Sequence, residues 1–447
     1  MKLPRTHKNS KTFQHHWPAL AGACLIGLLC MNTAQADSRD QAKRMHDRLA
    51  GVPPTEEVLC AMADLIASGD PEGAAQIVMN TGSVPDPSAG NTCSGGSGTI
   101  DNSLSKNAFY SVSLKNFVTP WTNEEQTIYA PLNDYTATVI GIIRDDHDFR
   151  EVLTGNYVYK DPGASYSLNN NTAYENLENS HADLSLNSNL ASTDQPWADP
   201  GGVNTTRAAG LAFFKDGTNR AMFRYTMINF MCRDLEQLKD TSRVPDRIRQ
   251  DVSRSPGGDS SLFLNSCIGC HSGMDPLAGA YAYYDWAANE QPDGTDLGNI
   301  THSTTIVHNP DADPPVKHKY LINSNNFPYG YITTDDSWKN YWRAGPNSNL
   351  GWQGNTDGSV TSGTGVNSMQ AELANTEAFA ECQVEKVYTQ VCLQPPVEGH
   401  ADNTNTTPPF TGPAGADGIK QIKEKFESGG YNLKDVFAKS ATLCMGN

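Results

Sequence analysis

The sequence predicts a mainly α-helical protein with long irregular polar loops. Several segments repeat apolar residues at the spacing of a helix face. Charged residues make up only 19% of the chain, while Gly (38) and Pro (26) are numerous, which indicates long polar loops between the ordered elements. No repeat of fixed period is visible, which argues against a solenoid. At 447 residues, the chain is long enough for two or three packed units.

Residues 1–36 have the pattern of an export signal. Four basic side chains, those of Lys2, Arg5, Lys8 and Lys11, precede a short apolar run at 20–31. Ala34-Gln35-Ala36 then forms a small-x-small cleavage site. The apolar run is too short for a membrane anchor. A buried core helix is the alternative, which the flanking charges disfavour. We therefore expect an exported protein, located in the periplasm, outside the cell or at the cell surface.

The charge and hydropathy of the chain exclude two broad classes. Removal of the four cations in the signal changes the formal net charge from −17 to −21. An acidic chain lacks the basic stripe that binds a nucleic-acid backbone, so we expect no nucleic-acid partner. No apolar run is long enough to span a bilayer, so we do not expect an integral membrane protein.

Residues 37–160 are predicted to form an N-terminal helical domain. Thr55 is expected to cap a helix that ends at Gly69, because two glutamates and an amphipathic pattern follow it. A second helix is expected at 71–79, and the apolar face at 132–143 marks a third. The acidic residues after the third helix have no calcium-loop spacing, so a solvated helix end is the favoured interpretation over a metal site.

The middle of the chain is expected to alternate between a loop and a helix. Residues 161–205 are dominated by polar residues and Pro without periodicity, which predicts a long surface loop. Residues 220–239 predict a helix that packs on the next unit. Its methionines suit a core face better than a metal site.

The most specific motif is Cys267-Ile268-Gly269-Cys270-His271. Covalent attachment of c-type haem needs two thiols one helical turn apart for the two thioether bonds, followed directly by a His that ligates iron. A zinc site would need two more close ligands, and a redox dithiol would need a thioredoxin-like context. The motif therefore predicts one covalently attached haem c, bound through Cys267, Cys270 and His271.

The second axial ligand is left open by the sequence, with Met369 as the first choice. Met369 follows a Gly/Ser/Thr-rich loop and is expected to precede a helix, where many single-haem cytochromes place a distal methionine. Met274 lies on the proximal helix, on the wrong face to reach round the ring. A vacant sixth position is the main alternative. Other candidates are Met445, His302, His308, His318 and His400.

Residues 206–395 are predicted to form a cytochrome c-like haem domain that contains a long insertion at 287–368. The insertion is rich in aromatic residues, which we expect to cover the porphyrin or, alternatively, to line a carbohydrate-binding cleft. A helix capped by Asn375 or Thr376 is expected to stop before Pro395-Pro396. Residues 396–447 are predicted as a C-terminal helical segment, with helices around 419–426 and 433–437.

Six cysteines remain outside the export signal and the haem motif, and in an oxidising compartment they are expected to form disulfides. Six cysteines permit fifteen pairings, so the sequence leaves the connectivity open. Distance along the chain favours two local pairs and leaves a third. These pairs are Cys60 with Cys93, Cys382 with Cys392, and Cys232 with Cys444.

The order of these segments resembles the large multidomain c-type cytochromes first seen in planctomycetes. The stretch "RLAGVPPT" at 48–55 is similar to the "R-x-x-G-x-P-P-T" opening of that family, and 134–153 is similar to one of its helix ends. The stretch "CIGCHSGMDP" at 267–276 matches the haem segment "C-x-x-C-H-x-x-M-D-P" closely. Residues 379–388 and 426–433 look like its C-terminal helical domain.

The resemblance implies an exported, mainly helical protein with one haem and His271 as iron ligand. It implies no substrate, because the activity of the family is itself undefined. The sequence departs from the family in the loops at 161–205 and 287–368 and in its six additional cysteines.

Three functions are compatible with these features. The first is a cytochrome that transfers one electron between exported partners, with its acidic surface steering it toward a redox partner with a basic surface. The second is a haem enzyme of peroxidase or oxidase type with an open sixth position. The third is a surface binding or assembly protein with a structural haem, whose aromatic loops contact carbohydrate or another subunit.

Overall fold

The computed structural model confirms a mainly helical protein with small sheets. It describes residues 37–85, 98–215, 217–292, 295–304, 327–354, 357–398, 410–411 and 415–446. Within these ranges the strands form five two-stranded antiparallel sheets. The predicted export signal at 1–36 lies outside the described residues, and residues 36–447 form one compact unit.

The first three helices start and end where local sequence signals place them. They are α1 (Ser38–Ala50), α2 (Glu56–Ala67) and α3 (Pro71–Met79). The Thr55 hydroxyl accepts a hydrogen bond from the Val58 amide at 3.3 Å, which confirms the predicted cap of α2. The two-residue strands β1 (Val84–Pro85) and β2 (Thr99–Ile100) follow and pair with each other.

Four consecutive short helical elements precede α6, whose eleven residues are all buried. They are α4 (Ser103–Ala108), the π-helix η1 (Phe109–Ser113), α5 (Leu114–Val118) and the 3-10 turn η2 (Thr119–Thr122). The third predicted helix is confirmed as α6 (Asp134–Arg144). A short helix, α7 (Glu151–Thr154), and the strand β3 (Tyr157–Lys160) follow it.

The prediction of a surface loop at 161–205 is wrong in part. The segment contains the helix α8 (Thr172–Asn179), the strand β4 (Ala191–Asp194) and the 3-10 turn η3 (Gly202–Thr205). β4 has no apolar alternation and becomes a strand because it pairs with β3. Five apolar side chains of the segment anchor it in the core: Tyr174, Leu177, Leu184, Leu190 and Val203.

The helix expected at 220–239 is shorter than predicted. A three-residue helix, α9 (Arg207–Ala209), and a π-helix, η4 (Gly210–Phe214), lead into α10 (Asn219–Met231). α10 ends because Cys232 takes a left-handed conformation (φ 50°). Its methionines are buried in the main core, as predicted.

The region from the haem motif through the predicted insertion also holds several short elements. Around the motif lie η5 (Pro256–Gly258), α11 (Ser260–Leu262), the π-helix η6 (Phe263–Cys267), α12 (Ile268–Ala278) and η7 (Gly279–Tyr281). The strands β5 (Tyr284–Ala287) and β6 (Asn299–His302) pair, as do β7 (Ser337–Asn340) and β8 (Thr361–Thr364). The turn η9 (Pro346–Leu350) and the helix α13 (Val366–Ala374) complete this region.

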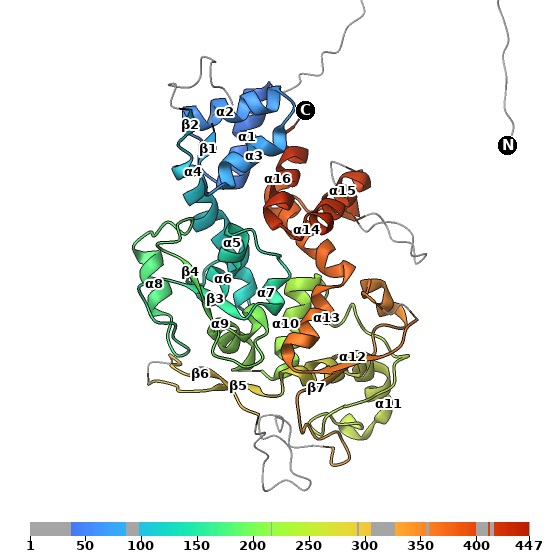
Figure 1. Cartoon of the computed structure of the whole chain (residues 1–447). Coiled ribbons are helices and arrows are strands. Elements are labelled where there is room, and N and C mark those ends of the chain that lie inside the picture. Colours follow the sequence, from blue (N-terminus) through green and yellow to red (C-terminus); the bar gives the residue numbers. More distant parts are fainter. Residues whose placement is uncertain are drawn as a thin grey trace, which may run out of the picture. The chain divides into compact units, whose positions relative to one another are not determined.

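The C-terminal helices pack against the N-terminal ones. They are α14 (Glu377–Cys392), α15 (Gly415–Ser428) and α16 (Leu433–Cys444), with the strands β9 (Val397–Glu398) and β10 (Phe410–Thr411) between α14 and α15. Thr376 caps α14, and its end at Leu393 (φ 59°) lies before the two prolines, as predicted. α16 contacts α1, α3 and α14, and Figure 1 shows these blue and red helices side by side.

Two of the three predicted disulfide pairs, Cys382 with Cys392 and Cys232 with Cys444, are wrong. Cys232 is bonded to Cys382, and Cys392 to Cys444. Cys382 and Cys392 are ten residues apart on one helix, so their side chains are separated by about 15 Å along its axis and cannot meet. Cys60 is also disulfide-bonded, while Cys93, its predicted partner, lies outside the described residues.

Such disulfides are typical of proteins that fold in an oxidising compartment. None of the helices in the described ranges has the length and apolar character required to cross a bilayer.

Candidate functional site

The three residues of the haem motif lie on one face of a continuous helical segment. Cys267 ends the π-helix η6, and Cys270 and His271 lie in the first turn of α12. Residues three and four positions apart are neighbours on a helix surface. The two thiols and the imidazole therefore project from the same side, and all three residues are partly exposed.

Cys267 and Cys270 are free thiols, whereas every other cysteine in the described part of the chain is in a disulfide. Burial raises the pKa of the Cys270 thiol, so it is protonated at neutral pH. Both thiols of the pair are therefore left available for covalent attachment of a group.

His271 is held by a carboxylate one turn further along α12. Its Nδ1 atom lies 3.1 Å and 3.2 Å from the two carboxylate oxygens of Asp275. A hydrogen bond of this kind fixes the ring orientation and leaves Nε2 as the nitrogen that can bind a metal. The Nδ1 atom of His271 is thus occupied by Asp275, and its Nε2 atom is the nitrogen left for a metal, as the motif predicts.

Asp275 is buried and belongs to a charged network that joins α10 to α12. Arg220 on α10 donates two hydrogen bonds to Asp275 (2.6 and 2.8 Å) and two to Asp251 (2.7 and 3.1 Å). Arg249 binds the same Asp251 carboxylate from the other side. Burial alone would raise the pKa of Asp275, but the charges of Arg220 and His271 lower it strongly. Asp275 is therefore an anion that is locked in place.

Asn219 extends this network to the end of the haem helix. The Arg249 guanidinium donates to the Asn219 side-chain oxygen, and the Asn219 amide donates to the Ala278 carbonyl at 2.7 Å. Ala278 is the last residue of α12. The network therefore holds both the face of the helix that carries His271 and its C-terminus.

Apolar side chains surround the motif and remain open to solvent. Leu262 and Leu264 are 47% and 55% exposed. Beside them, Ile248, Phe263 and Ile268 form a small buried cluster on which Cys267 packs. Two free thiols, an imidazole with one nitrogen held by a carboxylate, and exposed apolar side chains form a donor set that fits a covalently attached haem.

Met369 lies inside α13 rather than before a helix, which corrects that part of the prediction. Its side chain is fully buried in the main core. The start of α13 is fixed by Asp199, whose carboxylate accepts from the amides of Val366 and Asn367. No observation brings Met369 toward the imidazole of His271, so its role as a ligand stays a prediction.

The other candidate ligands are placed as follows. His302 lies among aromatic rings, with the Tyr284 ring 4.7 Å away, and burial lowers its pKa. Met445 ends the last helix, where its carbonyl accepts from Arg44. Among the described residues no group of three His, Cys, Asp or Glu side chains could hold a metal ion. His308, His318 and His400 lie outside the described residues.

The tryptophans of the predicted insertion are core residues. Trp338, Trp342 and Trp352 are 4%, 0% and 7% exposed. Trp342 packs directly against Gly273 of the haem helix, where an added Cβ atom would come within 1.9 Å of the indole nitrogen. Tyr329, at 87% exposed, remains open to solvent. Carbohydrate or subunit contact through these loops stays a prediction.

Sequence analysis missed the residues that hold His271. Asp275 lies four positions after His271 on the predicted haem helix, and this spacing is a signal that could have identified it. Arg220 and Asp251 are 55 and 31 residues from their partners in the network, and no local pattern indicates them.

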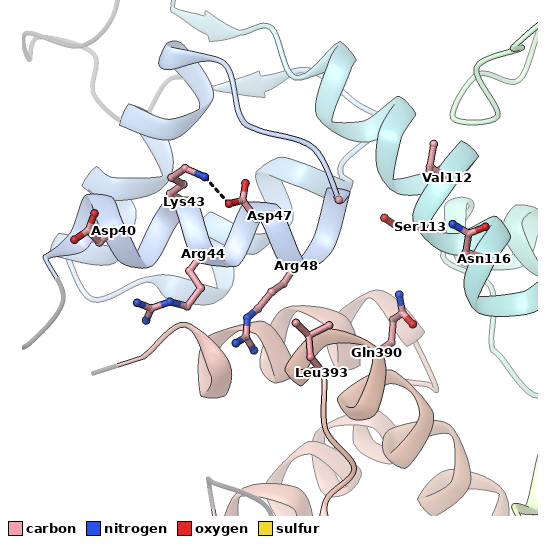
Figure 2. Close-up of a pocket in the computed structure, with 11 residues that line it drawn as sticks. Asp40, Lys43, Arg44, Asp47, Arg48, Val112, Ser113, Asn116, Gln390 and Leu393 are labelled. Carbon is pink, nitrogen blue, oxygen red and sulfur yellow. Dashed lines mark hydrogen bonds and ion pairs between the residues drawn. The ribbon is translucent and has the colours of Figure 1, made fainter. Parts of the chain in front are cut away.

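A separate cavity of about 810 Å³ lies between α1, η1 and α14. Figure 2 shows Arg44 and Arg48 projecting from α1 toward the C-terminal helices. Arg44 donates to the Met445 carbonyl and Arg48 to the Val391 carbonyl, at the ends of α16 and α14. Cations at helix C-termini stabilise those ends. These arginines therefore have a structural role in joining the two ends of the chain.

Comparison of the chain with known protein families, with curated proteins and with solved structures finds no match. The resemblance to the planctomycete-type cytochromes accordingly stays a prediction, and so does a cytochrome c-like arrangement of the haem domain.

Proposed function

We propose that the protein is an exported cytochrome that carries one haem c and transfers single electrons. The observation that carries this proposal is the pair of free thiols on the same helix face as His271, whose Nδ1 atom is occupied by the buried Asp275. The chain forms disulfides with its other described cysteines and keeps only this pair free.

Each residue of the site has a distinct role in this proposal. Cys267 and Cys270 form the two thioether bonds, and His271 presents Nε2 to the iron. Asp275 keeps the proton on Nδ1 and fixes the ring, while Arg220 balances the buried negative charge. The haem supplies one-electron exchange at its iron.

The surface charge suggests the kind of partner. With a formal net charge of −17 before signal removal, the protein attracts partners that present a basic surface. Association with such a partner slows as salt rises. The signal pattern and the disulfides support a location in the periplasm, outside the cell or at the cell surface.

A haem enzyme with an open sixth position is the second hypothesis. The hydrogen bond from His271 to the anionic Asp275 favours it, because a carboxylate partner raises the basicity of a histidine ligand and stabilises oxidised iron. The two hypotheses differ in the sixth ligand of the haem iron. We predict that Met369 is this ligand in the electron carrier, whereas the position stays open in the enzyme.

The absorption spectrum of the purified protein, with and without carbon monoxide, tests the proposal. An electron carrier with Met369 bound shows a c-type reduced spectrum that the gas leaves unchanged, and Met369→Ala alters both that spectrum and the potential. Ready binding of carbon monoxide by the unmodified protein supports the enzyme instead. A protein without haem absorption contradicts both.

A further inference from the structure

Arg207 is a buried arginine whose guanidinium has no hydrogen-bond partner among the residues that the structure describes. The residue is only 8% exposed, and its Nε atom is fully buried without an acceptor. The guanidinium carbon lies 5.9 Å from the centre of the Trp286 ring. Buried arginines are normally paired, so this one requires an explanation.

The backbone at this residue is held firmly by Asp134. The Asp134 carboxylate accepts hydrogen bonds from the amides of Arg207 and Ala208, at 2.7 and 3.0 Å, and from the Tyr166 hydroxyl at 2.8 Å. These bonds fix the backbone at the start of α9, and the Asp134 carboxylate also interacts electrostatically with the Arg207 side chain. No hydrogen bond joins the two side chains, so the guanidinium keeps its hydrogen-bond donors for a ligand.

Arg207 lines a cavity of about 490 Å³, a size that suits a small molecule. Ala208, Leu211 and Ala212 form an apolar wall on the same short helical segment. Lys215, a second cation of the lining, already lies 3.5 Å from the carboxylate of Asp296. Arg207 is thus the cation that this cavity offers to a ligand.

The mouth of the cavity is acidic. Glu124, Glu125 and Glu175 belong to the lining and are exposed. The chain as a whole is also strongly negative. This field repels a plain anion and attracts a positive group. A ligand that satisfies Arg207 must therefore carry its own cation.

We propose that this cavity binds a small zwitterion, with its carboxylate on Arg207, a short apolar body against Leu211 and Ala212, and its ammonium group at the glutamates of the mouth. Arginine binds a carboxylate through two parallel hydrogen bonds, and the free guanidinium supplies them. Free amino acids are the simplest ligands of this class. The site lies on α9 and η4 and is independent of the haem motif.

Calorimetric titration of the full exported chain with alanine, γ-aminobutyrate, propionate and propylamine tests the proposal. At least one zwitterion should bind at least tenfold more tightly than propionate or propylamine, which carry one charge each. Equal binding of propionate would contradict the role of the glutamates. Absence of binding by both zwitterions at millimolar concentration would overturn the proposal.

Single substitutions distinguish a loss of ligand binding from a loss of folding. Arg207→Met should weaken zwitterion binding at least tenfold, and Glu175→Gln should weaken it while making propionate binding tighter, because less negative charge then repels the anion. Arg39→Met, which removes an exposed arginine paired with Glu56, is the matched control and should change nothing. If Arg207→Met does not fold, Leu211→Trp fills the cavity from a half-buried position and should abolish binding. Unchanged affinity in a folded Arg207→Met or Leu211→Trp protein would overturn the assignment.

Discussion

Asp275 is the residue on which the candidate site depends most. It accepts from His271, forms a bidentate pair with Arg220 and is excluded from solvent. The same residue joins α10 to α12 and so contributes to stability. If His271 binds iron as proposed, the buried carboxylate would also stabilise the more positive state of the metal.

Replacing Asp275 with Asn should therefore affect two separate measurements. We expect the free energy of unfolding to fall by about 3 kcal/mol, because one partner of a buried charge pair is removed. We also expect the midpoint potential of the haem protein to rise, because the anionic partner of His271 is lost. Chemical denaturation and a redox titration measure the two effects.

Glu56→Gln is the control for this variant. It removes an exposed pair with Arg39, which solvent screens, and should leave both the stability and the potential nearly unchanged. If Asp275→Asn lowers the free energy of unfolding but leaves the midpoint potential unchanged, Asp275 has a structural role only.

Asp296, in the hairpin of β5 and β6, should make the free energy of unfolding depend on pH. Burial would raise its pKa, but hydrogen bonds from the amides of Asn289 and Gly298 and from the Trp286 indole lower it to about 2, compared with 3.8 ordinarily. The native state therefore binds fewer protons than the unfolded state. The stabilisation is complete above about pH 4 and is lost as the pH falls toward 2.

Comparison with Asp296→Asn measures this contribution. The difference in unfolding free energy between the two proteins should be constant from pH 7 to about 5 and shrink steadily below pH 4. A difference that is independent of pH down to 2 would contradict the assigned hydrogen bonds.

The helix α12 holds two glycines with different neighbours. An added Cβ at Gly273 would come within 1.9 Å of the ring of the fully buried Trp342, whereas at Gly269 it would come within 2.4 Å of Cγ of Lys239, an exposed residue. Alanine is the better helix former by about 1 kcal/mol at both positions. The two substitutions therefore differ mainly in whether the neighbour can move, and Lys239 can move more easily than Trp342.

We expect Gly273→Ala to lower the free energy of unfolding by about 1–3 kcal/mol, the usual cost of overpacking. Gly269→Ala should lower it less, because the exposed Lys239 side chain can move away from the added methyl group. Thermal unfolding of the two variants makes the comparison. Equal effects of both substitutions would mean that Trp342 does not pack on this helix.

The helix α14 is held by both described disulfides, to α10 through Cys382 and to α16 through Cys392. Closing the loop between Cys392 and Cys444 stabilises the protein by about 4 kcal/mol in the chain-entropy model. The double variant Cys392→Ala and Cys444→Ala should lose about that amount.

Peptide mapping without reduction tests the pairing itself. It should recover the peptides of Cys382 linked to Cys232 and those of Cys392 linked to Cys444. Recovery of a bond between Cys382 and Cys392 would show that α14 is not a continuous helix.

The elements with local signals could be predicted from the sequence, and those made by distant contacts could not. Thr55 and Pro71 mark the starts of α2 and α3 because capping and proline geometry act within one turn. β4 has no such signal and exists through its pairing with β3. Cys267, Cys270 and His271 form a local motif, whereas Arg220 reaches Asp275 only in the folded chain.

The segment that carries the C-x-x-C-H motif is a small part of a large helical protein. The N-terminal and C-terminal helices pack together, with Arg44 and Arg48 binding the ends of α16 and α14. Arg207 lies in a different cavity from any of these contacts. The proposed zwitterion site at Arg207 therefore shares no residue with the proposed haem site.

The proposed function depends on covalent attachment of haem to this chain. Attachment is measured by the intact mass of the denatured protein, expressed in a host that matures c-type cytochromes, together with its pyridine haemochrome spectrum. We predict one haem per chain that survives denaturation and is lost when Cys267 and Cys270 are both replaced by Ala. An unmodified mass for the native sequence, under conditions where a control cytochrome c acquires its haem, would contradict it.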